Sequence, residues 1–540
     1  MPWFLWTAAS LAVVFVVGWF VVPGLLRGLI KRRLSNYRTE YTVPDASKPE
    51  RLEGKRRVAV LGGGVAGLTA AITLARRGFE VELFESNAYL GGKLGSWKVP
   101  LGPNEEAWVS HGFHAFFPNY FNLNRFLDSL GLRREFISIG EYVILGTDGA
   151  EVRFGQMETT PVFNLLSLAR NGVYRFRDVL KAPARDVFGV FLEYDEKDTF
   201  SRYDDVSFAD FDRLAKLPPR LKLAFNTFAR AFFSDEDKLS LAELIKSFHF
   251  YYLGQDGGLV YDYPVHDYEP QFLAPMRAEL DRHGAKVHLS TRVESLERTA
   301  DGFRVNGTPF DRAVLATDVV GARAIMSQAT GIDAALRAPF EKLETGQRYA
   351  VLRIWIDKDV RTGFPPFVIT DRVKVLDAFT TYHRFEHEAQ AWTKQHGGAV
   401  LELHCYAVPE DLSPEQVRQA LLDEFEHFFP EVKGYTLKHE AFQLNRNFTA
   451  FHLGMYRHRP GVESGVPGLV CAGDWVKLPF PAMLLEAACA SGLCAANALL
   501  REVGLREEAV SAVPGRGLMA GVPPPPARKL LVPGAGKTTP

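Results

Sequence analysis

The sequence predicts an α/β protein with a dinucleotide-binding domain of the Rossmann type. Three observations support this: a glycine-rich turn between a strand and a helix, an acidic residue closing the next strand, and a second strand–turn–helix near the C-terminus. Residues 56–92 read RRVAVLGGGVAGLTAAITLARRGFEVELFESNAYLGG. Strand, glycine turn, helix and strand in this order form the unit that binds a dinucleotide in doubly wound sheets.

The glycine-rich turn follows the apolar run Arg57–Leu61, which we expect to be a strand. Gly62 allows a tight turn, Gly64 lets the backbone approach a pyrophosphate, and Gly67 lets the following helix pack on the strand. The first turn of that helix, which includes Ala66, has N–H groups without helical partners and directs them at the phosphates. The alternative is an ordinary glycine-rich turn without a ligand.

The next residues indicate which dinucleotide is bound. A second strand ends at Glu85, whose carboxylate can accept ribose hydroxyl hydrogen bonds and suits FAD or NAD better than NADP. Gly91, Gly92 and Lys93 follow. A second glycine pair can fold around the same pyrophosphate, and Lys93 either neutralises its charge or is simply solvated.

The C-terminal segment repeats this pattern. Leu469–Ala472 predicts a short strand, Gly473 and Asp474 a turn, and the small-residue stretch with Glu486 and Ala487 a helix whose N-terminus again suits an anion. We expect Asp474 to hydrogen-bond the ribityl chain or a phosphate, with a simple turn aspartate as the alternative. Two elements so far apart in sequence fit a cofactor stretched across the domain, as FAD is.

Through the E-x5-GG-K segment and the AGD…LLEAA…SG…AA segment, the chain resembles the FAD-dependent amine oxidase and phytoene desaturase superfamily. Ser110–Phe117 (SHGFHAFF) and Phe248–Gly254 (FHFYYLG) resemble the carotene desaturase/methylase branch, of the isorenieratene synthase type. Phytoene desaturases usually carry an aspartate where Ser110 stands, so the resemblance favours the ring-modifying branch. It extends from about Arg56 to Arg501.

The resemblance implies a fold and a domain order. An FAD-binding domain of the glutathione-reductase type is interleaved with an α+β substrate domain, Gly112 approaches the cofactor, and the backbone at Val293 faces adenine. The expected boundaries are a linker at 35–55, FAD-binding parts at 56–134, 265–325 and 441–505, substrate-domain parts at 135–264 and 326–440, and a flexible tail at 506–540.

The N-terminus predicts a membrane element in residues 1–34. Met1–Leu26 contains no charged side chain, and Arg27, Lys31, Arg32 and Arg33 follow it. About twenty apolar residues can span a bilayer, and basic residues after the span place the catalytic domain on the cytoplasmic side. Pro23 and Gly24 leave an oblique or interfacial helix as an alternative.

Elsewhere, hydrophobic periodicity predicts further elements. Helices are expected at Phe121–Leu132, Pro275–His283 and Pro414–Phe429, and strands at Lys286–Ser290, Thr291–Glu297, Phe303–Val305, Ala313–Ala316, Tyr349–Ile356 and Ala399–Tyr406.

Composition excludes several classes of function. The chain has 540 residues, of which 47% are hydrophobic, and a formal net charge of −1, so we expect no nucleic-acid surface. None of the four cysteines forms C-x-x-C, and histidines are scattered without a metal-ligand spacing, so no metal site is expected.

The resemblance also implies chemistry. The substrate would be a C40 carotene in an apolar tunnel lined by the aromatic stretches Phe225–Phe233 and Phe248–Tyr252, with hydride transfer to the flavin. In the ring-modifying branch, hydride loss from a β-ring leaves a cation, a 1,2-methyl shift and a proton loss follow, and the ring becomes aromatic. The candidate proton acceptors are His114 first, then His249, Asp262 and Glu486, the last expected beside the flavin or ribityl chain.

A lipid bilayer is the expected partner, and a quinone or O2 the electron acceptor. Two other functions remain open at this point. The chain could be a flavin oxidoreductase acting on another lipid or an amine, of squalene or amine oxidase type. It could also be a redox-silent flavoprotein, either an isomerase or a scaffold.

Overall fold

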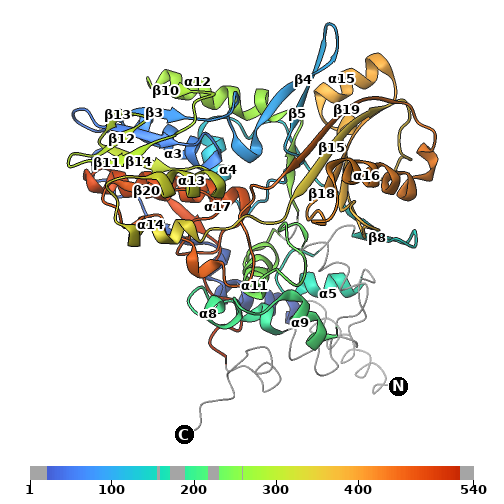
Figure 1. The fold of residues 1–540 in the computed structure, drawn as a ribbon. Coiled ribbons are helices and arrows are strands. Elements are labelled where there is room, and N and C mark those ends of the chain that lie inside the picture. Colours follow the sequence, from blue (N-terminus) through green and yellow to red (C-terminus); the bar gives the residue numbers. More distant parts are fainter. Residues whose placement is uncertain (1–20, 155–157, 171–188, 217–229, 258–259, 523–540) are drawn as a thin grey trace, which may run out of the picture.

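The computed structural model describes residues 21–154, 158–170, 189–216, 230–257 and 260–522 (Figure 1). Two sheets of different kinds organise these residues, one on each side of the view, with a group of helices below them. Residues 1–20 of the expected anchor and most of Phe225–Phe233 lie outside the described residues.

The five-stranded sheet is parallel, in the order β10-β3-β2-β14-β20. Its strands are buried on both faces, as expected when helices or other layers cover each side. Helices α3 and α17 pack together on one face (Figure 1). The strands are β2 (Arg57–Leu61), β3 (Glu80–Phe84), β10 (Lys286–His288), β14 (Arg312–Leu315) and β20 (Leu469–Cys471).

The seven-stranded sheet has the order β19-β15-β18-β17-β16-β7-β8 and is antiparallel except between β16 and β7. Helix α16 (Pro414–Phe428), which begins with a capping box at Ser413, covers one face with aliphatic side chains. The strands are β7 (Tyr142–Leu145), β8 (Glu151–Phe154), β15 (Tyr349–Ile356), β16 (Phe367–Thr370), β17 (Ala378–Thr381), β18 (Ala399–Cys405) and β19 (Leu437–Asn445).

Three small sheets complete the strands. The hairpin of β4 (Ser96–Gly102) and β5 (Glu105–Ser110) leads from the parallel sheet to the seven-stranded one. The others are β6 (Phe136–Ser138) with β9 (Asp262–Pro264), and β11 (Leu296–Arg298), β12 (Phe303–Val305) and β13 (Thr308–Phe310).

The last of these sheets corrects two expectations. The expected strand Thr291–Glu297 is extended only from Leu296 onward, and β12 belongs to a separate antiparallel sheet rather than continuing the parallel one. The turn at Asn306 and Gly307, both at positive φ, folds β12 back on β13 as a tight hairpin, which is why β12 leaves the parallel sheet.

Helices cover the parallel sheet and the outer face of the seven-stranded sheet, and a further group of helices lies below both sheets in Figure 1. Their bounds are α2 (Val22–Arg33), α3 (Val65–Arg76), α4 (Phe121–Ser129), α5 (Phe163–Arg170), α8 (Thr199–Tyr203), α9 (Phe208–Ala215), α11 (Leu241–Phe248), α12 (Ala274–Arg282), α13 (Val319–Gln328), α14 (Ala334–Glu341), α15 (His387–His396) and α17 (Leu484–Glu502).

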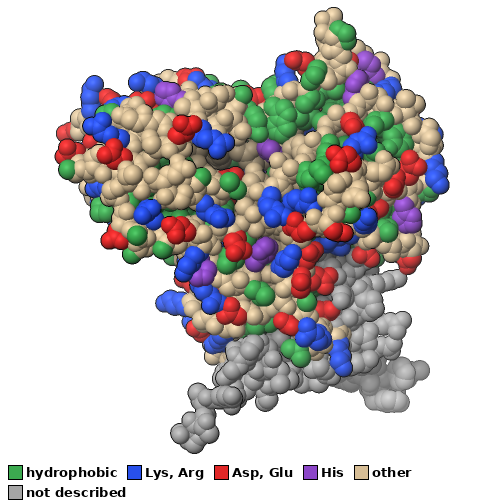
Figure 2. Space-filling view, viewed as in Figure 1, with side chains coloured by type: hydrophobic (Ala, Val, Ile, Leu, Met, Phe, Trp, Pro, Cys, Tyr) green, Lys and Arg blue, Asp and Glu red, His purple; other side chains and the backbone are tan. Residues whose placement is uncertain are grey.

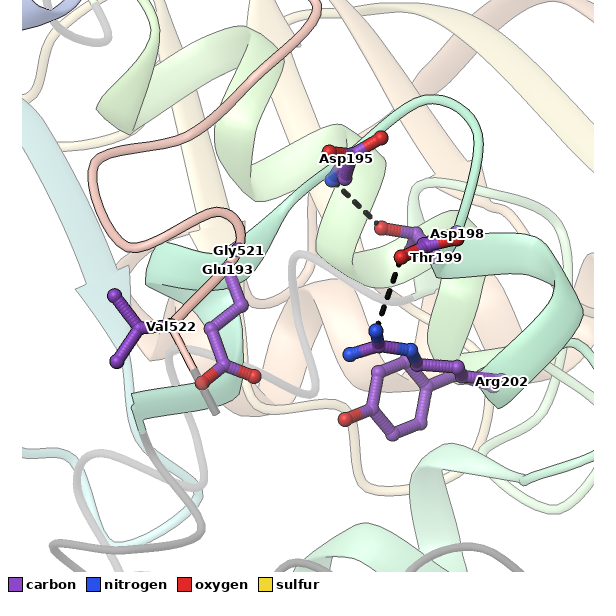
Figure 3. Close-up of a pocket in the computed structure, with 8 residues that line it drawn as sticks. Glu193, Asp195, Asp198, Thr199, Arg202, Gly521 and Val522 are labelled. Carbon is purple, nitrogen blue, oxygen red and sulfur yellow. Dashed lines mark hydrogen bonds and ion pairs between the residues drawn. The ribbon is translucent and has the colours of Figure 1, made fainter. Parts of the chain in front are cut away.

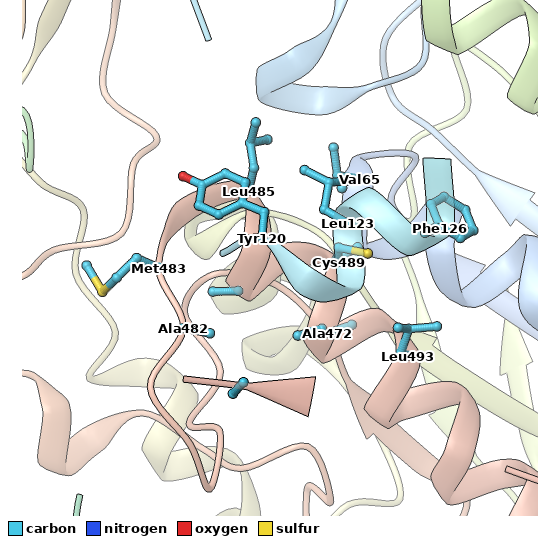
Figure 4. Close-up of a cluster of buried hydrophobic side chains, with 14 of the residues drawn as sticks. Val65, Tyr120, Leu123, Phe126, Ala472, Ala482, Met483, Leu485, Cys489 and Leu493 are labelled. Atoms are coloured by element: carbon cyan, nitrogen blue, oxygen red, sulfur yellow. The ribbon is translucent and has the colours of Figure 1, made fainter. Parts of the chain in front are cut away.

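Helix α17 is, within the described ranges, the one helix long and apolar enough to cross a membrane. Most of its apolar window is buried inside the protein, where Cys489 and Leu493 share a cluster with Leu123 and Phe126 of α4 (Figure 4). We therefore interpret α17 as a core helix. The expected N-terminal membrane helix is not supported, because the described part of residues 1–34 contains only the 12-residue helix α2.

Two segments, one in the expected linker and one in the expected tail, differ from the sequence prediction. Strand β1 (Thr39–Thr42), expected in a linker, pairs antiparallel with β21 (Val510–Ala512), expected in a flexible tail. The side chains of Val510, Ala512 and Val513 are buried in the main core, which places this part of the expected tail against the rest of the protein.

Candidate active site

The first glycine turn is sterically restricted to glycine. Gly62 has φ +111°, and a Cβ there would lie 2.6 Å from the Ala316 carbonyl oxygen. A Cβ at Gly67 would lie 2.0 Å from the carbonyl oxygen of Gly62. Helix α3 begins after Gly64 without a side-chain cap, so the N–H groups near Ala66 have no side-chain acceptor. These residues adopt the arrangement that the sequence predicts for phosphate binding.

The second glycine turn lies directly against the first. Gly91 and Gly92 both have positive φ, and a Cβ on Gly92 would lie 2.9 Å from the Cα of Gly64. The Gly91 N–H donates to the Gly63 carbonyl oxygen over 2.8 Å. The two turns therefore form a backbone-lined cradle in which side chains would not fit, and this suits a pyrophosphate.

Glu85 is fixed at the end of β3, beside the first turn. Its Oε2 accepts the Gly63 N–H over 2.8 Å, and its Oε1 accepts the Asn87 N–H over 2.8 Å. The Thr291 N–H donates to the Glu85 carbonyl oxygen over 2.7 Å, which brings the segment containing the half-buried Val293 to the same edge of the sheet. The ribose end of a dinucleotide fits here.

Lys93 and Asp474 join the second and third motifs. The Lys93 Nζ lies 3.0 Å from Asp474 Oδ2, and the Thr449 hydroxyl donates to Asp474 Oδ1 over 2.9 Å. Burial opposes the charge on Asp474, but Lys93 and these hydrogen bonds outweigh it and lower the pKa of the carboxyl group. Gly473 completes the turn, with its N–H donating to Ser491 of α17 over 2.8 Å. Lys93 is thus part-buried and paired with Asp474.

Glu486 lies in the first turn of α17 and is buried against α4. Its Oε1 accepts the Asn122 N–H and its Oε2 accepts the Leu123 N–H, each over 2.9 Å. The carboxyl group therefore caps the N-terminus of α4. Burial raises its pKa to about 7 despite these hydrogen bonds. Ala487 is buried beside it in the core.

The segment after β5 connects the cradle to the seven-stranded sheet. Gly112 has φ +113°, and a Cβ there would lie 3.3 Å from the ring of His404. The His114 Nδ1–H donates to the Gly112 carbonyl oxygen over 2.8 Å, which leaves Nε2 as the basic nitrogen. Among the described residues, no hydrogen bond reaches that Nε2. Burial lowers the pKa of His114 to about 4, so the ring is neutral near neutral pH.

The inner face of the seven-stranded sheet is polar where its outer face is aliphatic. Along β18, Leu401, Leu403 and Cys405 pack under α16, whereas Glu402 and His404 point the other way. Glu402 stands opposite Arg353 in the ladder, and the Arg353 Nε donates to Glu402 Oε2 over 2.9 Å. Both side chains are almost fully buried.

This ion pair has further partners. The Tyr382 hydroxyl donates to Glu402 Oε1 over 3.1 Å, and the Arg353 guanidinium lies 3.9 Å from the centre of the Tyr382 ring. The Arg353 Nη1 donates to the Trp108 carbonyl oxygen of β5 over 3.0 Å. The network therefore ties the hairpin that precedes Gly112 to the sheet.

Aromatic side chains surround the same region. Phe448 stacks on Phe233 and meets Tyr349 edge-on. The Lys93 ammonium group lies 4.5 Å from the centre of the Phe448 ring. Tyr406 stacks on His404 at 6.0 Å. The site between the two sheets thus combines charge at the cradle with rings on the sheet.

His249 and Asp262 lie in other environments. The His249 Nε2–H donates to the Pro514 carbonyl oxygen over 2.6 Å, and the ring stacks on Tyr194 in the main core. Burial lowers its pKa to about 4. Asp262 pairs with Arg133 at 2.8 Å and accepts from Ser138. Neither the His249 ring nor the Asp262 carboxylate lies beside Gly112.

Two surface cavities lie elsewhere, beside the C-terminal segment. The smaller, of about 10 Å³, is lined by Asp195, Asp198 and Arg202 (Figure 3). It has room for about one water molecule. The larger, of about 620 Å³, includes Arg33, Tyr41 and Glu196. None of the candidate residues lines either cavity. No group of three or more His, Cys, Asp or Glu side chains in the described residues is arranged to hold a metal ion.

Sequence reasoning missed Arg353, Glu402, His404 and Thr449. The available signal was the alternation of β18, in which charged and imidazole side chains interrupt an aliphatic strand that is otherwise typical of a buried sheet. The pairing of Glu402 with Arg353 depends on the strand register, which the sequence does not reveal.

Comparisons with known proteins identify the class. The model of the family of flavin-containing amine oxidoreductases matches residues 65–500, and the chain belongs to this family. The chain is thus an FAD-dependent oxidoreductase, and the resemblance inferred from its motifs is confirmed. The two glycine turns, Glu85 and the Lys93–Asp474 pair fit the cofactor.

Particular relatives refine this. The chain is 33% identical to the carotenoid phi-ring synthase of Streptomyces griseus, over 86% of this chain and 91% of that one. It is 26% identical to the carotenoid phi-ring synthase of Chlorobaculum tepidum, over 87% and 92% of the two chains. Cyclohexylamine oxidase from Brevibacterium oxydans has the same fold, with a TM-score of 0.59 at 15% identity over 83% of this chain and all of the other.

Proposed function

We propose that this flavoprotein desaturates a carotenoid and converts a β-ring into an aromatic ring with migration of a methyl group. The observation that carries the proposal is the similarity over nearly the whole chain to two proteins named carotenoid phi-ring synthase. The aromatic side chains beside Lys93 and Gly112 support an apolar substrate whose charge develops only during reaction.

The cofactor would be held by the residues of the three motifs. Gly62, Gly64, Ala66 and Gly67 would bind one side of the pyrophosphate, and Gly91 and Gly92 the other. The carboxylate of Glu85 would take the ribose, the backbone at Val293 the adenine, and Asp474, Gly473 and Ala487 the ribityl side, with Gly112 near the reactive ring. Bound FAD supplies hydride acceptance at N5.

The protein's own contribution is positioning, exclusion of water and proton transfer. Hydride loss from the β-ring leaves a carbocation, to which a methyl group migrates with its bonding electrons from the neighbouring gem-dimethyl carbon. His114 then removes a proton at Nε2, and the electrons of that C–H bond enter the ring.

His249 is the second candidate for this step. Its Nδ1 is free of hydrogen bonds among the described residues, as the Nε2 of His114 is. The charge around the two rings differs: Glu402 acts on His114, whereas burial and the Pro514 carbonyl are the influences on His249. An imidazolium formed at His249 would lack a counter-charge, so His114 is favoured.

We further propose that the enzyme acts at a membrane. Helix α2 exposes Leu25 and Leu29, each at 64%, on a face that also includes Val22 and Leu26, and its last turn is basic. Such a helix lies in a membrane interface.

The charges on the face shown in Figure 2 are mixed in sign, and hydrophobic side chains gather beside the notch between the two lobes. Residues 1–20 would anchor the chain with the catalytic domain in the cytoplasm, and a quinone or O2 would reoxidise the flavin.

The test is co-expression with a pathway that makes β-carotene, followed by pigment chromatography with mass detection. We expect a carotenoid whose ring end has lost four hydrogens at an unchanged carbon count. Unchanged β-carotene, with a yellow purified protein that an amine reduces, would instead indicate an amine oxidase. Unchanged pigment, with a flavin that is reduced neither by β-carotene nor by an amine, would indicate an isomerase or a scaffold.

A further inference from the structure

The starting observation is that two histidines, not one, lie on Gly112. His114 contacts its carbonyl oxygen through Nδ1, and the ring of His404 lies where a Cβ on Gly112 would come within 3.3 Å of Cε1 and 3.4 Å of Nδ1. The positive φ of Gly112 favours glycine, and a side chain there would press on the His404 ring.

The neighbours of His404 favour one tautomer. Its Nε2 lies 3.1 Å from the Thr380 hydroxyl, which can donate or accept, and 3.4 Å from Glu402 Oε1. Because a carboxylate only accepts, its position favours the tautomer with the proton on Nε2 and the lone pair on Nδ1, toward Gly112. In the described part of the chain, no hydrogen bond reaches Nδ1. A histidine held by a carboxylate on one nitrogen and open on the other has the form of a general base.

Glu402 can stabilise a positive charge on either ring. It opposes the effect of burial on the pKa of both His114 and His404. His404 and Lys93 act against it on His114, and on His404 Arg353 lowers the pKa whereas Asp377 raises it. The Arg353 and Tyr382 contacts hold the carboxylate in place, between strands β15 and β17. His249 has no carboxylate among its influences.

The proposed reaction requires two proton transfers from each ring to the protein. A trimethylcyclohexene ring that becomes a trimethylbenzene ring loses two hydrides and two protons. Each hydride leaves with its C–H electron pair for the flavin, which a quinone reoxidises between the two rounds. Each proton leaves its electron pair in the ring as a π bond, and the one methyl shift changes no atom count.

Resting on this proposed function, we propose that His404 is a second proton acceptor beside His114, and that Glu402 is the positioning residue that orients His404 and balances the charge formed on either ring. The first desaturation and the second then deliver their protons to different nitrogens, the Nε2 of His114 and the Nδ1 of His404, on the two sides of Gly112.

The activity test uses purified, FAD-loaded His404→Gln with β-carotene in lipid vesicles and a soluble quinone. We expect the aromatic product to fall by about 10²-fold or more, within the range for loss of one acid–base group, while a ring product lacking only two hydrogens accumulates. His383→Gln is the matched control, since His383 also pairs with a carboxylate, Asp359, at 3.1 Å on the same domain but away from Gly112. His383→Gln should behave as wild type.

The second test needs no turnover. Histidine ring carbons are labelled with ¹³C in the FAD-bound protein, and the resonances are assigned with His114→Gln, His404→Gln and His249→Gln. In Glu402→Gln, we expect the titrations of His114 and His404 to move to lower pH and that of His249 to stay in place. Thr380→Val keeps Glu402 but removes a hydroxyl from His404 Nε2, so it should shift the His404 titration less than Glu402→Gln does and leave that of His114 in place.

The outcomes are separable. If wild type makes no aromatic carotenoid, the proposed function fails whatever the titrations show. If wild type makes it and His404→Gln does so at an undiminished rate, or if Glu402→Gln moves neither titration, the role of His404 is refuted while the function stands. A folded, FAD-loaded His404→Gln that releases the half-oxidised ring supports it.

Discussion

Two buried histidine environments differ in one respect that matters for catalysis. Around Gly112, the carboxylate of Glu402, which the buried Arg353 holds in place, lies 3.4 Å from His404 and acts electrostatically on His114 as well. Around Pro514, His249 is packed among aromatic rings and has a carbonyl oxygen as its hydrogen-bond partner. All three rings are neutral when buried, but only the first environment lowers the cost of charging one. A buried histidine therefore accepts a proton more easily when a nearby carboxylate balances the positive charge of the imidazolium.

The largest effect is expected at His114. His114→Gln should lower turnover of β-carotene by about 10²–10⁴-fold, because a general base is lost. FAD content should be unchanged, since the glycine turns and the Lys93–Asp474 pair are untouched. Steady-state pigment assays with flavin absorbance as the loading control measure both. A loss of less than about fivefold would remove His114 from the mechanism.

The next effect is on stability at the ion pair. Arg353→Met leaves the buried Glu402 without its cation and should lower the free energy of unfolding by about 3–5 kcal/mol. The double variant Arg353→Met/Glu402→Leu should recover most of that loss, because the unpaired charge is gone. Denaturant unfolding of the three proteins tests this, and equal losses in single and double variants would contradict it.

A smaller, pH-dependent effect is expected at Glu486. Burial raises its pKa from 4.5 to about 7, so the stabilisation is complete below the unfolded pKa and is lost as pH rises through about 7. The amount is up to about 3 kcal/mol. The melting temperature of wild type should fall between pH 5 and pH 8 more than that of Glu486→Gln. If the melting temperatures of wild type and Glu486→Gln changed identically between pH 5 and pH 8, Glu486 would not titrate in this range and the prediction would be wrong.

The smallest effect is expected at His249, and it sharpens the comparison. His249→Gln loses the hydrogen bond to Pro514 and should lower stability by about 1–2 kcal/mol. Its turnover should stay within about threefold of wild type when measured well below the melting temperature. If turnover fell as far as in His114→Gln, the counter-charge argument would be wrong and His249 would be the base.

The sequence predicted the strand, glycine turn and helix of the proposed cofactor site because the constraints on them are local. Gly62, Gly67 and Glu85 are each set by sterics or hydrogen bonds within one strand–turn–helix unit. The turns at Gly91 and Gly473 followed from the same argument. The pairing of Lys93 with Asp474 did not, because it joins two distant motifs.

The substrate half was poorly predicted, because it depends on tertiary register. Glu402 faces Arg353 and Thr380 only when three strands are aligned as they are in β15, β17 and β18. The buried strand β21 was missed for a related reason: its glycine- and proline-rich surroundings are typical of a mobile tail, and only the core that receives Val510 orders it.

The most direct measurement is anaerobic mixing of the purified, FAD-loaded enzyme with β-carotene in lipid vesicles, followed by flavin absorbance and product mass. We predict that the yellow flavin band bleaches and that each equivalent of flavin reduced removes two hydrogens from a carotenoid ring. A flavin that stays oxidised with β-carotene, but bleaches with an amine, would contradict the proposal that this site oxidises an apolar ring.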